Sequence, residues 1–236
     1  MTLYIVATPI GNLSDITLRA LETLKSVDFI LAEDTRETKK LLDHYQIDKP
    51  MISYHQHSKL NKIDAIVDLL KQGKNLALVS DAGTPGISDP GNLLINLAIK
   101  QINNLTIVPI PGACALTAAA SISGFPTDKF IFFGFPPHKN KRNKFFEKVS
   151  QAEESIVLYE SVHRILKTLE DLKKHLGERE IMVARELTKK FETIYRGQIS
   201  KVIEKLKNDK ILGEFVIVVN TKTTNRNTKS TNVNVD

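Results

Sequence analysis

The stretch Leu76–Gly91, LALVSDAGTPGISDPG, constrains the fold more than any other part of the chain. A short apolar run breaks into a loop of three glycines and two prolines, a pattern typical of a buried strand that ends in a shaped loop. Open α/β sheets bind ligands at the carboxyl ends of their strands. The glycines permit positive φ or close approach of a ligand, and the prolines fix φ. The stretch therefore predicts either a ligand-binding loop or a tight connection that needs its glycines for geometry alone.

The charge of this loop narrows the ligand classes. It carries Asp81 and Asp89 and no lysine or arginine, so it would repel a phosphate. It also lacks the glycine spacing of a P-loop and of a dinucleotide-binding fold. An acidic, glycine-rich loop suits a ligand with positive charge, such as an ammonium or a sulfonium.

Composition sets the broad class of the protein. A chain of 236 residues with 42% hydrophobic and 25% charged residues is typical of a globular protein with two domains. The single cysteine, Cys114, permits no internal disulfide and fits a reducing, cytoplasmic location. We expect no signal peptide, because Met1–Ala7 has no basic start and Pro9–Gly11 interrupts the apolar run. We expect no membrane segment, because no apolar stretch is long enough to cross a bilayer. The net charge of +6 is compatible with nucleic acid, although a lysine-rich genome gives the same balance.

Apolar runs alternate with helical patterns along the first half of the chain, which predicts a parallel sheet with helices on both faces. Four strands end in unusual residues, at 8–12, 33–36, 80–91 and 111–112. Because the carboxyl ends of parallel strands share one edge, we expect these loops to build one site. We predict an N-terminal α/β domain at 1–122, a C-terminal α/β domain at 123–220, and a disordered tail at 221–236 that has almost no apolar residues.

Two local predictions are specific enough to test. Asp15 should cap a helix that buries Leu18, Leu21 and Leu24 on one face. Phe215–Asn220 is apolar almost throughout, so it should form a strand in the middle of the second sheet.

Six stretches between residues 6 and 192 carry a family resemblance: VATPIGNLSDITLRA, AEDTR, VSDAGTPGISDPG, PIPGACALTAAASISGFPTDKFIFFGFP, YESVHRI and ARELTKKFE. The chain resembles the tetrapyrrole (corrin/porphyrin) methylases, a family of S-adenosylmethionine-dependent methyltransferases, and its RNA-modifying branch in particular. Ser161-Val162 and His55-Gln56-His57 depart from the Ala-Pro and His-Glu-His expected there. The resemblance implies two α/β domains, with a parallel sheet in the first and a mixed sheet in the second. It also implies a cofactor cleft between them, and a homodimer.

The same resemblance assigns the cofactor contacts. Residues implied to bind S-adenosylmethionine are Pro9, Gly11, Asp81, Ala82, Gly83, Thr84, Pro85, Ile87, Thr117, Ala118, Leu158, Tyr159 and Ala184. No metal is implied. The acidic charge of the loop at 80–91 independently favours S-adenosylmethionine, because this cofactor carries a sulfonium and an ammonium.

Titratable residues at the strand ends are candidates for catalysis and for RNA contacts. Glu160, His163 and Glu186 are candidate proton acceptors, with His55 and His57 as further ones; a structural histidine is the alternative at each His. Candidates for phosphate contacts are Arg36, Lys39, Arg164, Lys189 and Lys190. The alternative for the lysines is a solvated face. The basic segment Lys139–Lys148 is compatible with RNA binding and equally with an exposed amphipathic helix.

The resemblance implies 2′-O-methylation of a cytidine ribose in 16S ribosomal RNA, with the RNA or the small subunit as substrate. One alternative is a tetrapyrrole C-methyltransferase of the same fold, acting on a uroporphyrinogen or precorrin. Another is a basic RNA-binding protein without catalysis. The segments AEDTR and ARELTKKFE favour the RNA branch, and no RRM aromatic pair, KH loop or helix-turn-helix pattern supports a binding module.

Overall fold

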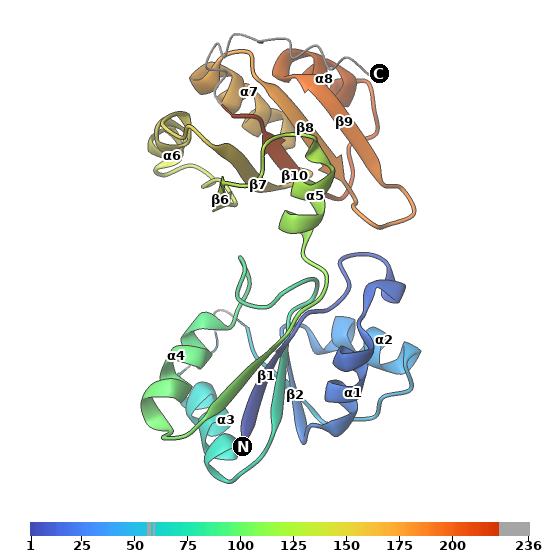
Figure 1. The fold of residues 1–236 in the computed structure, drawn as a ribbon, viewed down its shortest axis with the longest axis vertical. Coiled ribbons are helices and arrows are strands. Elements are labelled where there is room, and N and C mark those ends of the chain that lie inside the picture. Colours follow the sequence, from blue (N-terminus) through green and yellow to red (C-terminus); the bar gives the residue numbers. More distant parts are fainter. Residues whose placement is uncertain (56–57, 59, 222–236) are drawn as a thin grey trace, which may run out of the picture. The chain divides into compact units, whose positions relative to one another are not determined.

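The computed structural model describes residues 1–55, 58 and 60–221, which form two compact units (Figure 1). The N-terminal unit comprises Met1–Ala119 and Ala184–Thr193. The C-terminal unit comprises Ala120–Val183 and continues from Ile194 to the end of the described chain. The sequence predicted one boundary, after residue 122, and gave no sign that residues 184–193 pack with the N-terminal unit. Apart from Thr221, the predicted disordered tail lies outside the described residues.

The N-terminal unit is built on a five-stranded sheet of order β3-β2-β4-β1-β5. All its pairings are parallel, and Leu3 lies opposite both Leu76 and Ile107. The strands are β1 (Thr2–Val6), β2 (Phe29–Ala32), β3 (Met51–Ser53), β4 (Leu76–Val79) and β5 (Thr106–Ile110). The strand that carries the glycine-rich loop is therefore the central one.

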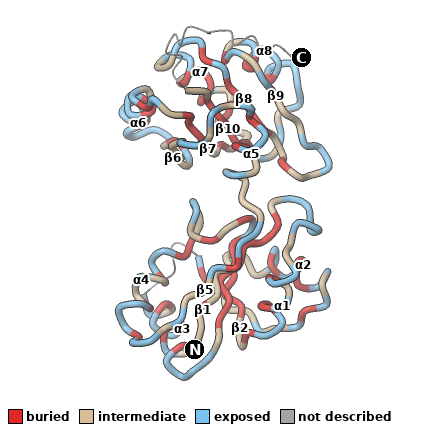
Figure 2. The backbone as a smooth tube through the Cα atoms, in the orientation of Figure 1, coloured by how far each residue is buried: buried red, intermediate tan, exposed pale blue. Residues whose placement is uncertain are grey.

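Helices cover both faces of this sheet, because side chains alternate between the faces along each strand. Leu76 and Leu78 of β4 pack in one core cluster with α3 (Leu60–Lys71) and α4 (Asn92–Gln101). Their neighbours Ala77 and Val79 pack in another with α1 (Leu18–Ser26) and α2 (Thr35–His44). Figure 2 shows the buried residues following the central strands. The predicted parallel sheet with helices on both faces is confirmed.

The C-terminal unit contains most of a second five-stranded sheet, of order β6-β7-β10-β8-β9. It is mixed, since β7 pairs with β6 in parallel and with β10 antiparallel. Its strands are β6 (Phe130–Gly134), β7 (Ser155–Ser161), β8 (Glu180–Arg185), β9 (Thr193–Gln198) and β10 (Glu214–Val219). The prediction that the last apolar run lies in mid-sheet is confirmed.

Three helices pack in one core cluster with this sheet: α6 (Arg142–Ser150), α7 (Ile165–Leu176) and α8 (Ile199–Lys207). Phe215 and Ile217 of β10 belong to that cluster, and Val216 and Val218, which alternate with them along the strand, are buried as well. Because both faces of the central strand are buried, its sequence is apolar without alternation. The remaining helices in the described part of the chain are the 3₁₀ turn η1 (Leu13–Asp15) and α5 (Ala115–Ser123), which runs across the boundary between the units.

The predicted start of the first helix is wrong. Asp15 lies in η1, and the cap of α1 is Thr17, whose hydroxyl accepts a 3.1 Å hydrogen bond from the Ala20 amide. Leu18 is 80% exposed, whereas Leu24 is buried. At 3.6 residues per turn, Leu18 and Leu24 lie roughly 120° apart around the helix. Three leucines spaced three residues apart therefore do not all lie on one face of the helix.

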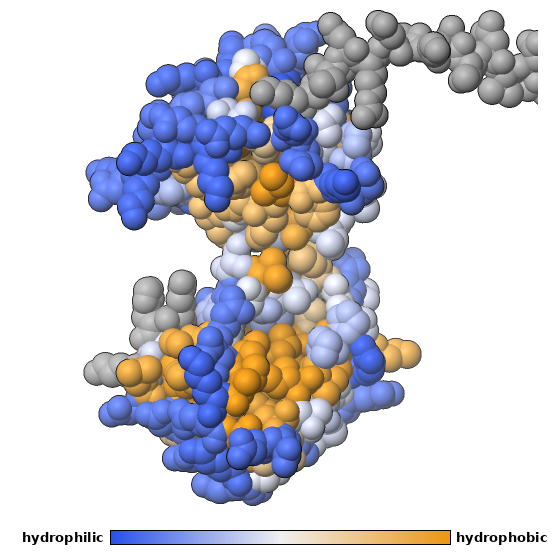
Figure 3. Space-filling view, turned by 60° about the vertical axis from the view of Figure 1, so that its left-hand side comes forward, coloured by the Kyte–Doolittle hydropathy of each residue, from blue (hydrophilic) through white to orange (hydrophobic). Residues whose placement is uncertain are grey.

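Apolar side chains also reach the surface of the N-terminal unit, as the orange area in Figure 3 shows. Leu93 and Ile99 of α4 are 48% and 58% exposed. Among the described residues, no helix is both long enough and apolar enough to cross a membrane.

Candidate functional site

The four unusual loops lie at one edge of the parallel sheet, as predicted, and hydrogen bonds join them to one another. Thr8 and Gly83 form an antiparallel bridge, with N–H···O distances of 2.8 and 3.0 Å. The Asp34 amide donates a 2.9 Å bond to the Asp81 carboxylate, which links the loops after β2 and β4. The Thr84 hydroxyl donates to the Ala113 carbonyl at 3.2 Å and so connects the β4 loop to the β5 loop.

Gly83 is required by the geometry of the loop itself. Its φ is +82°, and a Cβ added there would lie 3.3 Å from the Ile10 side chain. Gly86 also has a positive φ, of +85°. Since Gly83 is bridged to Thr8 and packed on Ile10, its backbone is fixed before any ligand binds.

Carboxylates dominate the charge at this edge. Burial, together with the charge of Asp81, raises the pKa of Glu33, and burial also raises the pKa of Asp81. Hydrogen bonds from the Arg36 guanidinium lower the pKa of Asp34. The Arg36 guanidinium lies 2.5 Å from that carboxylate, so this arginine is already paired. The edge therefore suits a cationic ligand, which would relieve the repulsion between Glu33 and Asp81.

The residues expected to hold the cofactor divide between the units. Eleven of the thirteen lie in the N-terminal unit: Pro9, Gly11, Asp81, Ala82, Gly83, Thr84, Pro85, Ile87, Thr117, Ala118 and Ala184. Leu158 and Tyr159 lie on β7 in the C-terminal unit. Leu158 is fully buried in the core cluster that includes α6, α7 and α8. Tyr159 lies beside Phe132 and Phe135, with ring centroids 4.9 and 5.5 Å away. These contacts with the cofactor stay predictions.

The candidate proton acceptors have different surroundings. Glu160 is 1% exposed, and its carboxylate accepts from the Ser161 amide at 2.7 Å and from the Thr168 hydroxyl at 2.6 Å. Its remaining partner is Arg164, at 2.8 Å. Glu186 pairs with Lys189 at 2.8 Å. Because its oxygens are enclosed and bonded, Glu160 fits a positioning role better than proton transfer.

Histidines are the other candidate proton acceptors. His163 and His55 are exposed, and His57 lies outside the described residues. Within the described part of the chain, no group of three or more His, Cys, Asp or Glu residues could hold a metal ion.

The sequence did not predict the surroundings of Arg142. This arginine lies in the basic segment Lys139–Lys148, yet it is 6% exposed. It donates to Asp171 at 2.7 Å, to the Thr168 hydroxyl at 2.8 Å and to the Pro137 carbonyl at 2.9 Å. The sequence signal for its burial was its place one helical turn before the apolar Phe146, which is buried in the structure.

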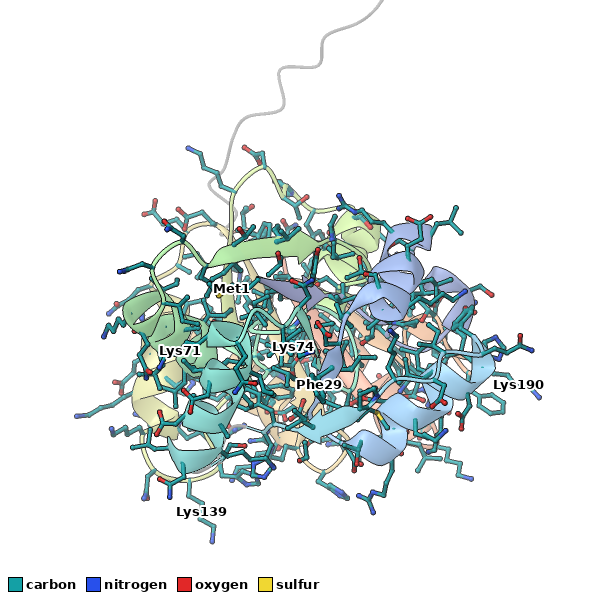
Figure 4. The ribbon with its side chains drawn as sticks, turned by 90° about the horizontal axis from the view of Figure 1, so that it is seen from below. Met1, Phe29, Lys71, Lys74, Lys139 and Lys190 are labelled. Atoms are coloured by element: carbon teal, nitrogen blue, oxygen red, sulfur yellow. The ribbon has the colours of Figure 1, made fainter. Side chains whose placement is uncertain are left out.

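The basic residues expected to contact RNA also differ in their contacts. Arg36 pairs with Asp34, Lys39 with Asp43, Arg164 with Glu160 and Lys189 with Glu186. Lys190 is exposed and extends away from the ribbon (Figure 4). Its ammonium lies 5.7 Å from the centroid of the Phe191 ring.

The chain is thus a two-unit α/β protein. The first unit has a parallel sheet with the four loops of the candidate site at one edge, and most of the second sheet, which is mixed, lies in the second unit. Residues 2–203 match the family model described as Tetrapyrrole (Corrin/Porphyrin) Methylases. The chain belongs to this family.

Two relatives with high identity carry the same name. The chain is 50% identical over 219 residues to the Ribosomal RNA small subunit methyltransferase I of Synechocystis, covering 92% of this chain and 78% of that protein. It is 46% identical to the protein of the same name from Thermotoga maritima, covering 93% and 98%. A solved structure of a cobalt precorrin-4 methyltransferase matches with a TM-score of 0.67 at 18% identity, covering 93% of this chain and 94% of that one. At this level of identity, the match to the solved structure shows only that the two proteins share a fold.

Proposed function

We propose that the protein transfers a methyl group from S-adenosylmethionine to the 2′-hydroxyl of a cytidine in 16S ribosomal RNA. The observation that carries this proposal is the acidic, glycine-shaped loop after β4, bonded to its neighbours through Thr8 and Asp34. A loop of that charge suits a cationic methyl donor. The relatives, which match 92–93% of this chain and are named small-subunit ribosomal RNA methyltransferases, support ribosomal RNA as the acceptor. The cytidine 2′-hydroxyl rests on the family resemblance.

When bound, S-adenosylmethionine supplies a methyl group that its sulfonium charge already activates. The protein then has to position the methyl donor and orient the acceptor hydroxyl toward it, which requires a rigid site. The Thr8–Gly83 bridge holds the backbone of the loop, and Asp81 supplies negative charge at the same edge. A ribose hydroxyl is a weak nucleophile, and a nearby base contributes about 10²–10⁴-fold. We propose His163 or Glu186 for that task and a positioning role for Glu160.

The decisive experiment measures cofactor and acceptor separately. Titration calorimetry should detect S-adenosylmethionine binding, and labelled methyl should pass to unmethylated small ribosomal subunits, with the label recovered as a 2′-O-methylcytidine. Label on uroporphyrinogen instead would favour the tetrapyrrole reaction, for which the solved structures give only a shared fold. RNA binding without cofactor binding would favour a non-catalytic module.

Two further properties belong to the proposal. A ribosomal substrate and a single reduced cysteine both favour a cytoplasmic protein. The family resemblance favours a homodimer, and the exposed Leu93 and Ile99 on α4 offer apolar surface for one. Sedimentation at micromolar concentration tests the dimer, and a Leu93→Asp, Ile99→Asp variant should sediment as a monomer if α4 is the contact.

A further inference from the structure

The turn at residues 186–192, which we call the 186–192 turn, packs in the N-terminal unit against the loop that follows β1. A Cβ added at Gly11 would lie 2.8 Å from the Thr188 hydroxyl and 2.9 Å from the Leu187 carbonyl. Real Cβ atoms do not approach so closely, so only glycine at position 11 permits this packing. The turn is thus held beside one of the loops that form the candidate site.

The 186–192 turn is fixed in an unfavourable backbone conformation. Glu186 and Thr188 have φ of +52° and +65°, which residues with a side chain rarely adopt. Hydrogen bonds hold it: the Lys189 amide donates to the Glu186 carbonyl at 3.0 Å, and the Thr188 amide donates to the Glu192 carboxylate at 2.7 Å. Such strain persists where surrounding contacts over-determine it, and it clusters at ligand sites.

This strained turn presents an aromatic ring to solvent. Phe191 is 70% exposed, although burial would be favourable for a phenylalanine. The Lys190 ammonium lies 5.7 Å from the ring centroid. An exposed aromatic face beside a cation is the combination with which proteins bind unpaired nucleotides, since the base stacks and the cation contacts the phosphate.

We propose that Phe191 is a stacking platform for an unpaired base of the RNA substrate, with Lys190 at a flanking phosphate. This inference rests on the proposed function and adds to it a contact with a base. The rigid turn pre-organises the ring, so that binding orders few additional side chains.

The chain has no tryptophan, so Phe191→Trp introduces a single fluorescent reporter at the proposed contact. Its emission should be quenched by unmethylated small ribosomal subunits and should not change with S-adenosylmethionine alone. The matched control is Leu18→Trp, at an apolar position that is 80% exposed in the same unit. Its emission should stay unchanged with both. Quenching of Phe191→Trp by ribosomal proteins freed of RNA would assign the ring to a protein contact and overturn the proposal.

Affinity provides the second readout. Phe191→Ala should weaken binding to the small subunit about tenfold, as the loss of one stacked base does, with S-adenosylmethionine affinity and melting temperature unchanged because the ring is exposed. Phe191→Tyr should retain the affinity. The salt dependence should not change, since stacking releases no counterions.

The outcomes separate the two proposals. If the wild type methylates the subunit while Phe191→Ala binds it equally well and the Phe191→Trp reporter is silent, stacking alone is overturned. If the wild type neither binds nor methylates the subunit, the proposed function fails and the stacking inference fails with it.

Discussion

The Glu160 carboxylate accepts a 2.6 Å hydrogen bond from the hydroxyl of Thr168, eight residues further along the chain. The same hydroxyl accepts a 2.8 Å bond from Arg142, and the carboxylate pairs with Arg164 at 2.8 Å. The Thr168 hydroxyl thus donates to a carboxylate and accepts from a guanidinium. Arg142 and Arg164 also donate to the carbonyls of Pro137 and Pro136. The network therefore fixes the segment after β6 to the end of β7 and to the first turn of α7.

Thr168→Val should lower the free energy of unfolding by about 2–4 kcal/mol, because it leaves both Glu160 and Arg142 short of a partner in a buried site. Urea denaturation measures the change. Thr168→Ser is the control, since it keeps the hydroxyl and should stay within about 1 kcal/mol of the wild type. A valine variant as stable as the wild type would show that water replaces the hydroxyl.

Glu160→Gln distinguishes positioning from proton transfer. We expect a loss of about 3 kcal/mol in stability, because Arg164 would keep a charge without its partner. The rate per folded molecule at saturating substrate should fall less than tenfold, whereas loss of a general base costs about 10²–10⁴-fold. A stable variant with a thousandfold lower kcat would make Glu160 the base.

Asp81→Asn should separate stability from cofactor affinity. Burial raises the pKa of Asp81 in the folded protein, so the favourable contribution of the protonated group is lost as pH rises through that folded pKa. At neutral pH the asparagine variant should therefore melt no lower than the wild type, and the difference should shrink in acid. The side-chain amide oxygen of the variant would still accept a hydrogen bond from the Asp34 amide.

The same variant should bind S-adenosylmethionine about three- to tenfold more weakly, since one partly screened charge is removed. Calorimetry measures this affinity, which in the wild type should also decline as Asp81 becomes protonated. Asp68→Asn, at an exposed acid on α3, is the control. Equal affinities for the Asp81 variant and the wild type would rule out a charge contribution.

Gly83→Ala and Gly73→Ala form a matched pair. Their φ angles are +82° and +86°, and a Cβ at Gly73 would meet nothing within 4 Å. Each variant should lose about 1 kcal/mol of stability through backbone strain. Only Gly83→Ala should lose cofactor affinity, because its Cβ presses on Ile10 and its backbone bridges Thr8. Comparable affinity losses in both would point to a global effect of lower stability.

Lys189 and Lys190 should differ in the salt dependence of RNA binding. Lys190→Ala should reduce the slope of log K against log salt by about 0.7, the value for one phosphate contact on single-stranded RNA. Lys189→Ala should change it less, because the Lys189 ammonium already pairs with Glu186. Measuring RNA affinity over a series of low to moderate salt concentrations tests both predictions. Unchanged slopes would show that both lysines lie on a solvated face and contact no phosphate.

Much of the N-terminal unit was predictable because its signals are local. An apolar run followed by glycines marks a strand and its loop, and parallel strands bring their carboxyl ends together whatever else the chain does. The central place of β10 followed equally from its uninterrupted apolar run. The cap at Thr17 was missed because Asp15 and Thr17 are both good cap residues, and packing of Leu24 and Ala20 decides between them.

By itself, the sequence determined the alternating architecture, the glycine-shaped acidic loop and its place at the end of a buried strand, since these depend on periodicity, backbone freedom and charge. Only the tertiary structure decided that Arg142 is buried on Thr168, that Arg36 is already paired with Asp34, and that residues 187–189 pack against Gly11. These contacts join residues far apart in the chain or choose one partner among several. Their energies depend on burial and geometry, which local patterns indicate only in part.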